Sequence, residues 1–153
     1  MSNSKKSEKP PSSIVNRKAF YDFTISENFV CGIVLKGTEV KSIRLGMAQL
    51  KDSFAKIENG EVWLYNCHIS PYQFGNRFNQ EPLRKRKLLL HKKEILKIYQ
   101  KIKEANYVLV PIKIFFSRNN AKVEIGLGKG KKVYDKRDSI KKKELQRTIK
   151  QYK

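Results

Sequence analysis

The chain has 153 residues, and its 34 Lys and Arg against 14 Asp and Glu give it a formal net charge of +20. Because so large a surplus repels itself unless a polyanion compensates it, the charge argues against a neutral small-molecule enzyme and favours nucleic acid as the partner. A membrane surface is the competing partner, but the mean hydropathy of −0.62 and the absence of an apolar run of about 20 residues exclude a transmembrane helix.

The first 16 residues are expected to form a mobile arm, because they contain Ser, Lys and a Pro-Pro pair and nothing apolar before Ile14. They lack the apolar segment of a secretory signal. Two cysteines, Cys31 and Cys67, make no disulfide framework, which fits a reducing cytoplasm. Hydrophobic residues still make up 39 % of the chain, so a folded core is expected.

The segment from Phe20 to Leu35 has the composition of a β-strand. The stretch that follows breaks this pattern, and Lys41 to Arg44 is predicted as one helical turn that stops at Gly46.

The clearest local signal is a hairpin at Asn59-Gly60, since both turn positions favour residues that accept positive φ. Both faces of this hairpin are partly apolar, which is typical of a small closed or strongly curled sheet. The predicted pairs are Ile57 with Val62 and Ala55 with Leu64 on one face, and Lys56 with Trp63 and Phe54 with Tyr65 on the other.

An amphipathic helix follows the polar loop from Pro71 to Pro82. Its apolar stripe has the spacing i, i+3, i+4 and i+7 and consists of Ile95, Ile98, Tyr99 and Ile102. His91 is predicted as its N-cap, with Glu94 in the reciprocal capping position.

A second hairpin is predicted from Tyr107 to Leu127, with its turn at Asn119-Asn120. This turn places Ile114 opposite Ile125, and Pro111 marks an edge or a bulge because it has no N–H to donate. The other predicted pairs are Phe116 with Val123 and Ile112 with Leu127.

Apolar residues become sparse after Gly130, where Lys and Arg dominate. Leu145, Ile149 and Tyr152 have helical spacing, but this stripe is too thin to hold a helix without a partner. We therefore expect an arm over residues 1–16, a folded domain over residues 17–130, and a tail over residues 131–153 that orders on binding.

Motifs for catalysis and metal binding are weak. The run Gly126 to Lys132 misses the phosphate-loop spacing by one residue and lacks its Ser or Thr, so a flexible basic exit from the last strand is favoured. Cys67 and His68 point to opposite faces of a strand, which disfavours a shared zinc ion. Glu58 and Glu61 face each other beside an exposed turn, which offers no pocket for acid–base chemistry.

Several residues allow two interpretations. Glu39 either forms a structural ion pair with Lys41 or Arg44, or accepts hydrogen bonds from a base or ribose. The basic runs 84–87 and 129–132 are either solvated faces or nucleic-acid contacts. Aromatic side chains either stack on bases or fill the core, and the core is favoured; they are Tyr21, Phe54, Trp63, Tyr65 and Tyr72.

The chain resembles the bacterial SsrA-binding protein (small protein B, SmpB) family. The resemblance runs from about residue 16 to residue 153 and rests on six motifs that occur in the same order. The signature is Gly37-Thr38-Glu39-Val40-Lys41-Ser42-Ile43-Arg44. The supporting segments are Asp52-Ser53-Phe54, His68-Ile69-Ser70-Pro71-Tyr72, Arg86-Lys87-Leu88-Leu89-Leu90, Gly126-Leu127 through Lys129-Gly130-Lys131-Lys132, and Tyr134-Asp135-Lys136-Arg137.

The resemblance implies a mainly β fold with flanking helices, an antiparallel barrel of the oligonucleotide-binding (OB) type. It implies no enzymatic activity. With the weak metal-binding motifs noted above, no cofactor or metal is expected. The function implied is that of an adaptor, a monomer in the cytoplasm, which binds the tRNA-like domain of transfer-messenger RNA and brings it to stalled ribosomes. Elongation factor Tu is implied to deliver the complex. The barrel is implied to occupy the decoding region, and the tail is implied to enter the messenger channel and become helical there.

Carried over by position, the resemblance assigns RNA contacts to Glu39, Lys41, Arg44, Leu89 and His91, with the basic side chains Arg84, Arg86, Lys87, Lys129, Lys131 and Lys132. It assigns ribosome contacts to Tyr134, Asp135, Lys136, Arg137, Ile149 and Tyr152. His91 and Tyr134 stand where many relatives are expected to have Asn and His. The alternative function is a structural ribosomal protein with a basic extension.

Overall fold

A computed structural model of the chain describes residues 13–75 and 79–131. Within these ranges strands alternate with three helices. In chain order the elements are β1 (Ile14–Val15), α1 (Arg17–Asp22), β2 (Phe23–Ile33), α2 (Gly37–Arg44), β3 (Ala48–Gln49), β4 (Phe54–Glu58), β5 (Glu61–Tyr65), β6 (His68–Ile69), β7 (Arg86–Leu89), α3 (Lys92–Ala105), β8 (Val108–Ser117) and β9 (Asn120–Gly130).

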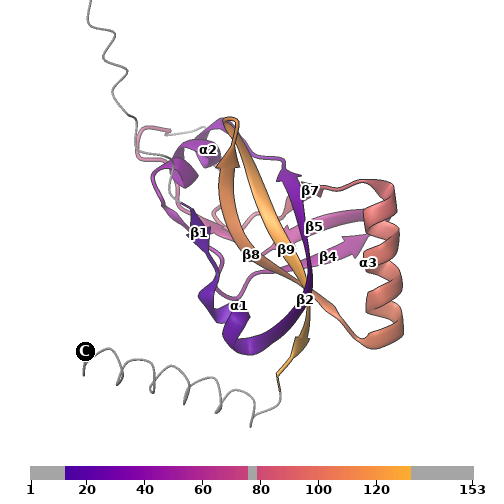
Figure 1. The fold of residues 1–153 in the computed structure, drawn as a ribbon. Helices are drawn as coiled ribbons and strands as arrows, with labels where there is room; N and C mark the ends of the chain where they lie inside the picture. Colours follow the sequence, from indigo (N-terminus) through magenta and orange to yellow (C-terminus); the bar gives the residue numbers. More distant parts are fainter. Residues whose placement is uncertain (1–12, 76–78, 132–153) are drawn as a thin grey trace, which may run out of the picture.

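The main sheet closes on itself. Its strand order is β8-β4-β5-β7-β2-β9, and β9 pairs again with β8, so the pairings form a ring of antiparallel strands. β1 adds to β8 outside this ring, and β3 pairs with β6 in a small second sheet. Closure of this kind leaves few free edges. The ring confirms the predicted mainly β, barrel-type fold with flanking helices, in which α2 lies at one end of the barrel and α3 along its side (Figure 1).

Side chains from alternate strand positions fill the interior of the barrel, as the period of two requires. Ile43 from α2 and Ile98 from α3 join them and have no exposed surface. The apolar strand residues without exposed surface are Val62, Leu64, Ile114, Val123, Ile125 and Leu127. The two helices are thus fastened to the barrel by one core.

The first hairpin has the predicted register, with Ile57 opposite Val62 and Lys56 opposite Trp63. Its turn residues Asn59 and Gly60 both have positive φ, of 50° and 76°. The Asn-Gly pair therefore fixed the pairing of β4 with β5.

The predicted register of the second hairpin is wrong by two residues. The turn lies at Arg118 and Asn119, which both have positive φ, and Ile114 faces Val123 instead of Ile125. A shift of two keeps the same side chains inward. Pro111 marks a bulge, since the register shifts between Pro111 and Lys113.

The folded domain begins before residue 17, where its start was predicted. Ile14 pairs with Ile114, and the Asn16 amide donates a 2.8 Å hydrogen bond to the Pro111 carbonyl, so residues 14–16 belong to the sheet and to the cap of α1. Residues 20–22 are helical and not the start of a strand. Residues 1–12 lie outside the described residues.

The glycine-rich run that begins at Gly126 is part of β9 as far as Gly130, which pairs with Phe23. A Cβ atom at Gly126 would lie 2.7 Å from Cγ2 of Ile25 and 2.8 Å from Cδ1 of Ile112, so a larger residue does not fit there. Gly126 therefore permits close packing of strands, and because residues 126–130 are part of β9, the predicted flexible exit is wrong for them.

Candidate nucleic-acid interface

α2 is a short basic helix at the upper end of the barrel in Figure 1. The Glu39 carboxylate caps its start by accepting the backbone N–H of Lys36 at 2.8 Å. Gly46, with a φ of 73°, follows its end. Ser42 Oγ donates a 2.7 Å hydrogen bond to the Ser70 carbonyl. The predicted turn at Lys41–Arg44 is thus the second half of an eight-residue helix tied to the neighbouring loop.

A buried ion cluster of Glu39, Arg84 and Arg86 connects α2 to the segment before β7 and to β7 itself. Glu39 is 3 % exposed, and it accepts hydrogen bonds from Nε of Arg86 at 2.6 Å and from Nη2 of Arg84. Arg86 has no exposed surface, and its remaining nitrogens donate to the carbonyls of Cys67 and Pro82 at 2.7 and 3.2 Å. One guanidinium therefore connects α2 with the chain on both sides of the loop before β7.

Hydrogen bonds keep the buried carboxylate of Glu39 ionised. Burial by itself raises the pKa of Glu39, but the Lys36 amide and the two guanidinium groups outweigh burial and lower it. Glu39 stays ionised at neutral pH. The structural ion pair predicted for Glu39 is confirmed, but its partners are Arg84 and Arg86, so the expected pairing with Lys41 or Arg44 is wrong. The assignment of Glu39 and Arg86 as RNA contacts stays a prediction.

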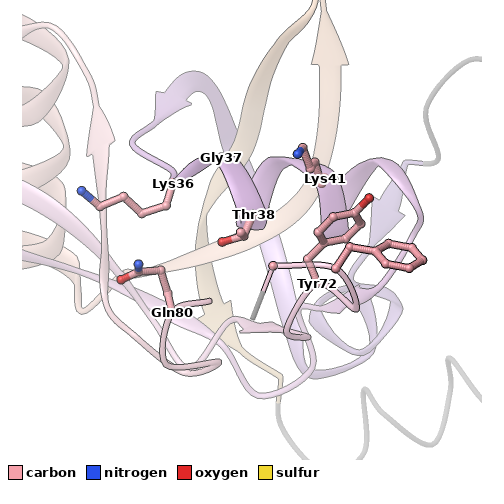
Figure 2. Close-up of a pocket in the computed structure, with 8 residues that line it drawn as sticks. Lys36, Gly37, Thr38, Lys41, Tyr72 and Gln80 are labelled. Carbon is pink, nitrogen blue, oxygen red and sulfur yellow. The ribbon is translucent and has the colours of Figure 1, made fainter. Parts of the chain in front are cut away.

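Above the cluster lies an open pocket of about 400 Å³ between α2 and the loop after β6 (Figure 2). Lys41 and Tyr72 lie toward one side of it, Lys36 and Gln80 toward the other, and Thr38 lies between them. The lining is completed by Gly37, Phe74 and Gly75. The pocket combines two ammonium groups with an aromatic ring, which suits a phosphate beside a base.

The aromatic part of the pocket is held in place from both sides. Lys41 Nζ lies 5.3 Å from the Tyr72 ring centroid, and the rings of Tyr72 and Phe74 meet edge to face at 5.6 Å. The Asn79 side chain accepts the Tyr72 N–H at 2.8 Å and donates to the Tyr72 carbonyl at 2.9 Å. Residues 76–78, between them, lie outside the described residues.

Two further cations extend the basic face around α2. The guanidinium carbon of Arg44 lies 4.9 Å from the Phe116 ring centroid, near the tip of the β8–β9 hairpin. Arg84 is 28 % exposed at its side chain, so it links the buried cluster to the surface. The structure thus brings Lys41, Arg44 and Arg84 together on one side of the barrel.

The outer face of β4, β5 and β7 carries aromatic side chains and lysines. Phe54 stacks on Tyr65 with ring centroids 5.3 Å apart, and Lys85 Nζ lies 4.6 Å from the Trp63 centroid. These rings point away from the interior that Val62 and Leu64 occupy, so their predicted place in the core is wrong. Lys87 lies on the same face, where it pairs with Glu61 at 3.0 Å.

Leu89 and His91 lie at the far end of β7 from Arg84 and Arg86, beside the start of α3. Leu89 is 53 % exposed, and His91 is exposed at the N-cap of α3. The Glu94 carboxylate accepts the His91 N–H at 3.2 Å, which confirms the predicted cap position. Both side chains are open to solvent, but neither lines the pocket beside α2.

The basic end of β9 is separate from α2, at the opposite end of the barrel (Figure 1). Lys129 Nζ lies 4.7 Å from the Tyr107 ring centroid, and Lys131 Nζ donates to the Phe20 carbonyl at 2.9 Å. The remaining predicted contacts lie outside the described residues; they are Lys132, Tyr134, Asp135, Lys136, Arg137, Ile149 and Tyr152.

Sequence reasoning missed Lys36 and Gln80 as parts of the pocket. Lys36 directly precedes the Gly37-Thr38-Glu39 motif, and its position at the helix start is the signal that identifies it. Gln80 comes from a loop far along the chain, and no local pattern marks it.

Comparison with known proteins decides the family. The profile of the SmpB protein family matches residues 13–153. The chain belongs to the SmpB protein family. It is similar to the SsrA-binding protein of Carboxydothermus hydrogenoformans, with 60 % identity over 134 residues, which cover 88 % of this chain and 90 % of that protein. The SsrA-binding protein of Geobacter sulfurreducens is 59 % identical over 136 residues, 89 % of either chain.

A solved structure agrees with the family assignment. It is described as "tmRNA-SmpB: a journey to the center of the bacterial ribosome" and matches with a TM-score of 0.67 and 48 % identity, over 79 % of this chain and 85 % of that one. The SmpB barrel and its helices therefore have a counterpart of known structure. Within the described residues, no helix is long and apolar enough to cross a membrane.

Proposed function

We propose that this SmpB family member is a non-catalytic adaptor that binds the tRNA-like domain of transfer-messenger RNA and delivers it to stalled ribosomes for trans-translation. Family membership carries this proposal, since relatives that match nearly nine-tenths of the chain are SsrA-binding proteins. The net charge of +20 supports it, because each lysine or arginine that meets a phosphate releases counterions.

The face around α2 is the proposed binding surface for the RNA. Its pocket of about 400 Å³ lies within the size range of sites for small ligands, and so it suits one nucleotide at a time. Lys36 and Lys41 would meet phosphates and Tyr72 would stack on a base, while Glu39 and Arg86 hold α2 in position beneath them. Leu89, His91 and Lys87 would extend the contact along β7.

The tail is proposed to act separately from the barrel. Residues 131–153, with Tyr134 to Arg137 at their start, would enter the decoding centre and messenger channel and become ordered there. We place the protein in the cytoplasm as a monomer, where elongation factor Tu would deliver it through the RNA complex.

Sequencing the RNA that co-purifies with the tagged full chain tests the proposal. Transfer-messenger RNA should be strongly enriched, and the protein should be substoichiometric to ribosomes. Retention on every ribosome through a high-salt wash, without this RNA, would instead identify a structural ribosomal protein.

A truncation before Asp135 tests the division of labour. The shortened chain should bind transfer-messenger RNA like the full chain but fail to support tagging on stalled ribosomes. Normal tagging by the shortened chain would refute the two-part design.

A further inference from the structure

The outer side of α3 presents apolar side chains to solvent. Ile98 is buried against the barrel, whereas Leu96 and Tyr99 are 59 % and 50 % exposed. Leu96 and Tyr99 are three residues apart, so they lie on one stripe of the helix. This stripe borders the end of the β4–β5 hairpin, across which α3 lies in Figure 1.

Two adjoining cavities join this stripe to the barrel wall. One, of about 480 Å³, is lined by Phe54, Val108 and the apolar part of α3, and the other, of about 720 Å³, by Leu96 and the Asn59-Gly60 turn. Both cavities include Ile57 and Tyr99, so they meet at these two side chains and are treated together as one groove. We call it the α3 groove.

The α3 groove follows from an incomplete seam in the barrel. β4 and β8 pair only at Ala55 and Leu109, and the α3 side chains cover the gap from outside. Phe54 and Val108 remain 38 % and 44 % exposed beside it. Exposed apolar side chains that gather in one groove of a strongly charged protein suit a docking surface for a partner.

Among the described residues, the unpaired charges at the rim of the α3 groove are those of lysines. Lys56 and Lys92 line its two cavities, and Lys103 lies three helical turns beyond Lys92 on the same stripe. Glu61 also lines the second cavity, but it is paired with Lys87 at 3.0 Å, and the nearby Glu58 is paired with Lys85 at 3.7 Å. The rim is therefore complementary to an anionic partner.

We propose that the α3 groove binds an acidic amphipathic segment of a partner protein. Apolar side chains of that segment would fill the groove between Ile57 and Tyr99, and its carboxylates would meet Lys56, Lys92 and Lys103. A phosphate backbone has no apolar side chains to bury there. The basic tail of this chain and a second copy of it both carry the same sign of charge as the rim.

A designed peptide probe tests this proposal with the full chain at about 0.15 M salt. The probe has Leu at i, i+3, i+4 and i+7 and Glu or Asp elsewhere, and it is compared by fluorescence anisotropy with a shuffled peptide of equal composition. The patterned peptide should bind at least tenfold more tightly than the shuffled one. The double variant Leu96→Ser/Tyr99→Ser should lose this difference, and the control Leu45→Ser, at another leucine that is 63 % exposed, should keep it.

Three results would overturn the proposal. Equal binding of the patterned and shuffled peptides means attraction by charge alone, and persistence of the difference in the double variant means another site. The third comes from a photo-crosslinking residue at position 96 of the full chain: crosslinks to residues 132–153 would show that the tail is the occupant, and crosslinks to added RNA would show a nucleic-acid surface.

Discussion

Nε of Arg86 donates a 2.6 Å hydrogen bond to the carboxylate of Glu39, and together these side chains connect α2 to β7 across 47 positions of sequence. Neither side chain reaches the surface, yet the residues that line the pocket above them depend on their position. With α2 as the proposed RNA-binding face, the cluster would act on RNA binding through the placement of this helix.

Replacing Glu39 with Ala should destabilise the fold strongly. The change leaves the buried guanidinium of Arg86 without its counter-charge, and removing one member of a buried pair costs about 3–5 kcal/mol. Urea unfolding should show this loss, and specific RNA binding should weaken with it. The control is Glu61→Ala, which breaks an exposed pair with Lys87 and should cost less than about 1 kcal/mol. Full stability of Glu39→Ala, with only its RNA affinity reduced, would instead support a direct contact between Glu39 and the RNA.

The contribution of Glu39 to stability should depend on pH. Its pKa is lowered in the folded state, so the unfolded chain, where the pKa of Glu is about 4.3, binds the proton more readily. The stabilisation is therefore fully present above that value and is lost as pH falls through the lower pKa of the folded state. The difference in unfolding free energy between the wild type and Glu39→Gln should shrink on acidification. A difference that stays constant from neutral to strongly acidic pH would contradict the ion pair.

Local turn chemistry explains what the sequence could predict of the fold. Asn59-Gly60 specifies its hairpin, so the register of β4 and β5 follows from the sequence alone. In the second hairpin Arg118 adopts the positive φ that Asn120 was expected to supply, and a bulge after Pro111 then shifts the pairing. Neither choice is visible locally, because the packing of β9 against both β2 and β8 decides it.

The candidate site was harder to predict for the same reason. The motif around Glu39 led to α2 and to Lys41, but the partners of Glu39 lie 45 and 47 residues away and not beside it in the sequence. Burial of Arg86 likewise depends on the tertiary fold. A basic residue in a basic run gives no sign that it is the one turned inward.

Lys41→Ala should weaken RNA binding in a way that salt reveals. If Lys41 meets a phosphate, its loss should reduce the slope of log Kobs against log salt by about 1. Filter binding over a salt series measures this slope. Lys97→Ala is the matched control, since Lys97 is bound to Glu27 at 2.6 Å on the side of α3, and the slope should not change. Identical slopes for the Lys41 variant and the wild type would remove Lys41 from the phosphate contacts.

Substitutions of Tyr72 should separate stacking from hydrogen bonding. Tyr72→Phe keeps the ring beside Lys41 and should leave RNA affinity nearly unchanged, whereas Tyr72→Ala should lose about 1–3 kcal/mol, the value of one stacked base. The loop should persist in both variants, because Asn79 bonds to the backbone of Tyr72 and not to its ring.

The control for this pair is Tyr99→Ala, which removes a half-exposed tyrosine from α3, away from the pocket. It should bind transfer-messenger RNA like the wild type in the same titration. Equal RNA affinity of Tyr72→Ala and the wild type would show that the Tyr72 ring stacks on no base. Loss in both Tyr72→Phe and Tyr72→Ala would instead assign the contact to the hydroxyl group.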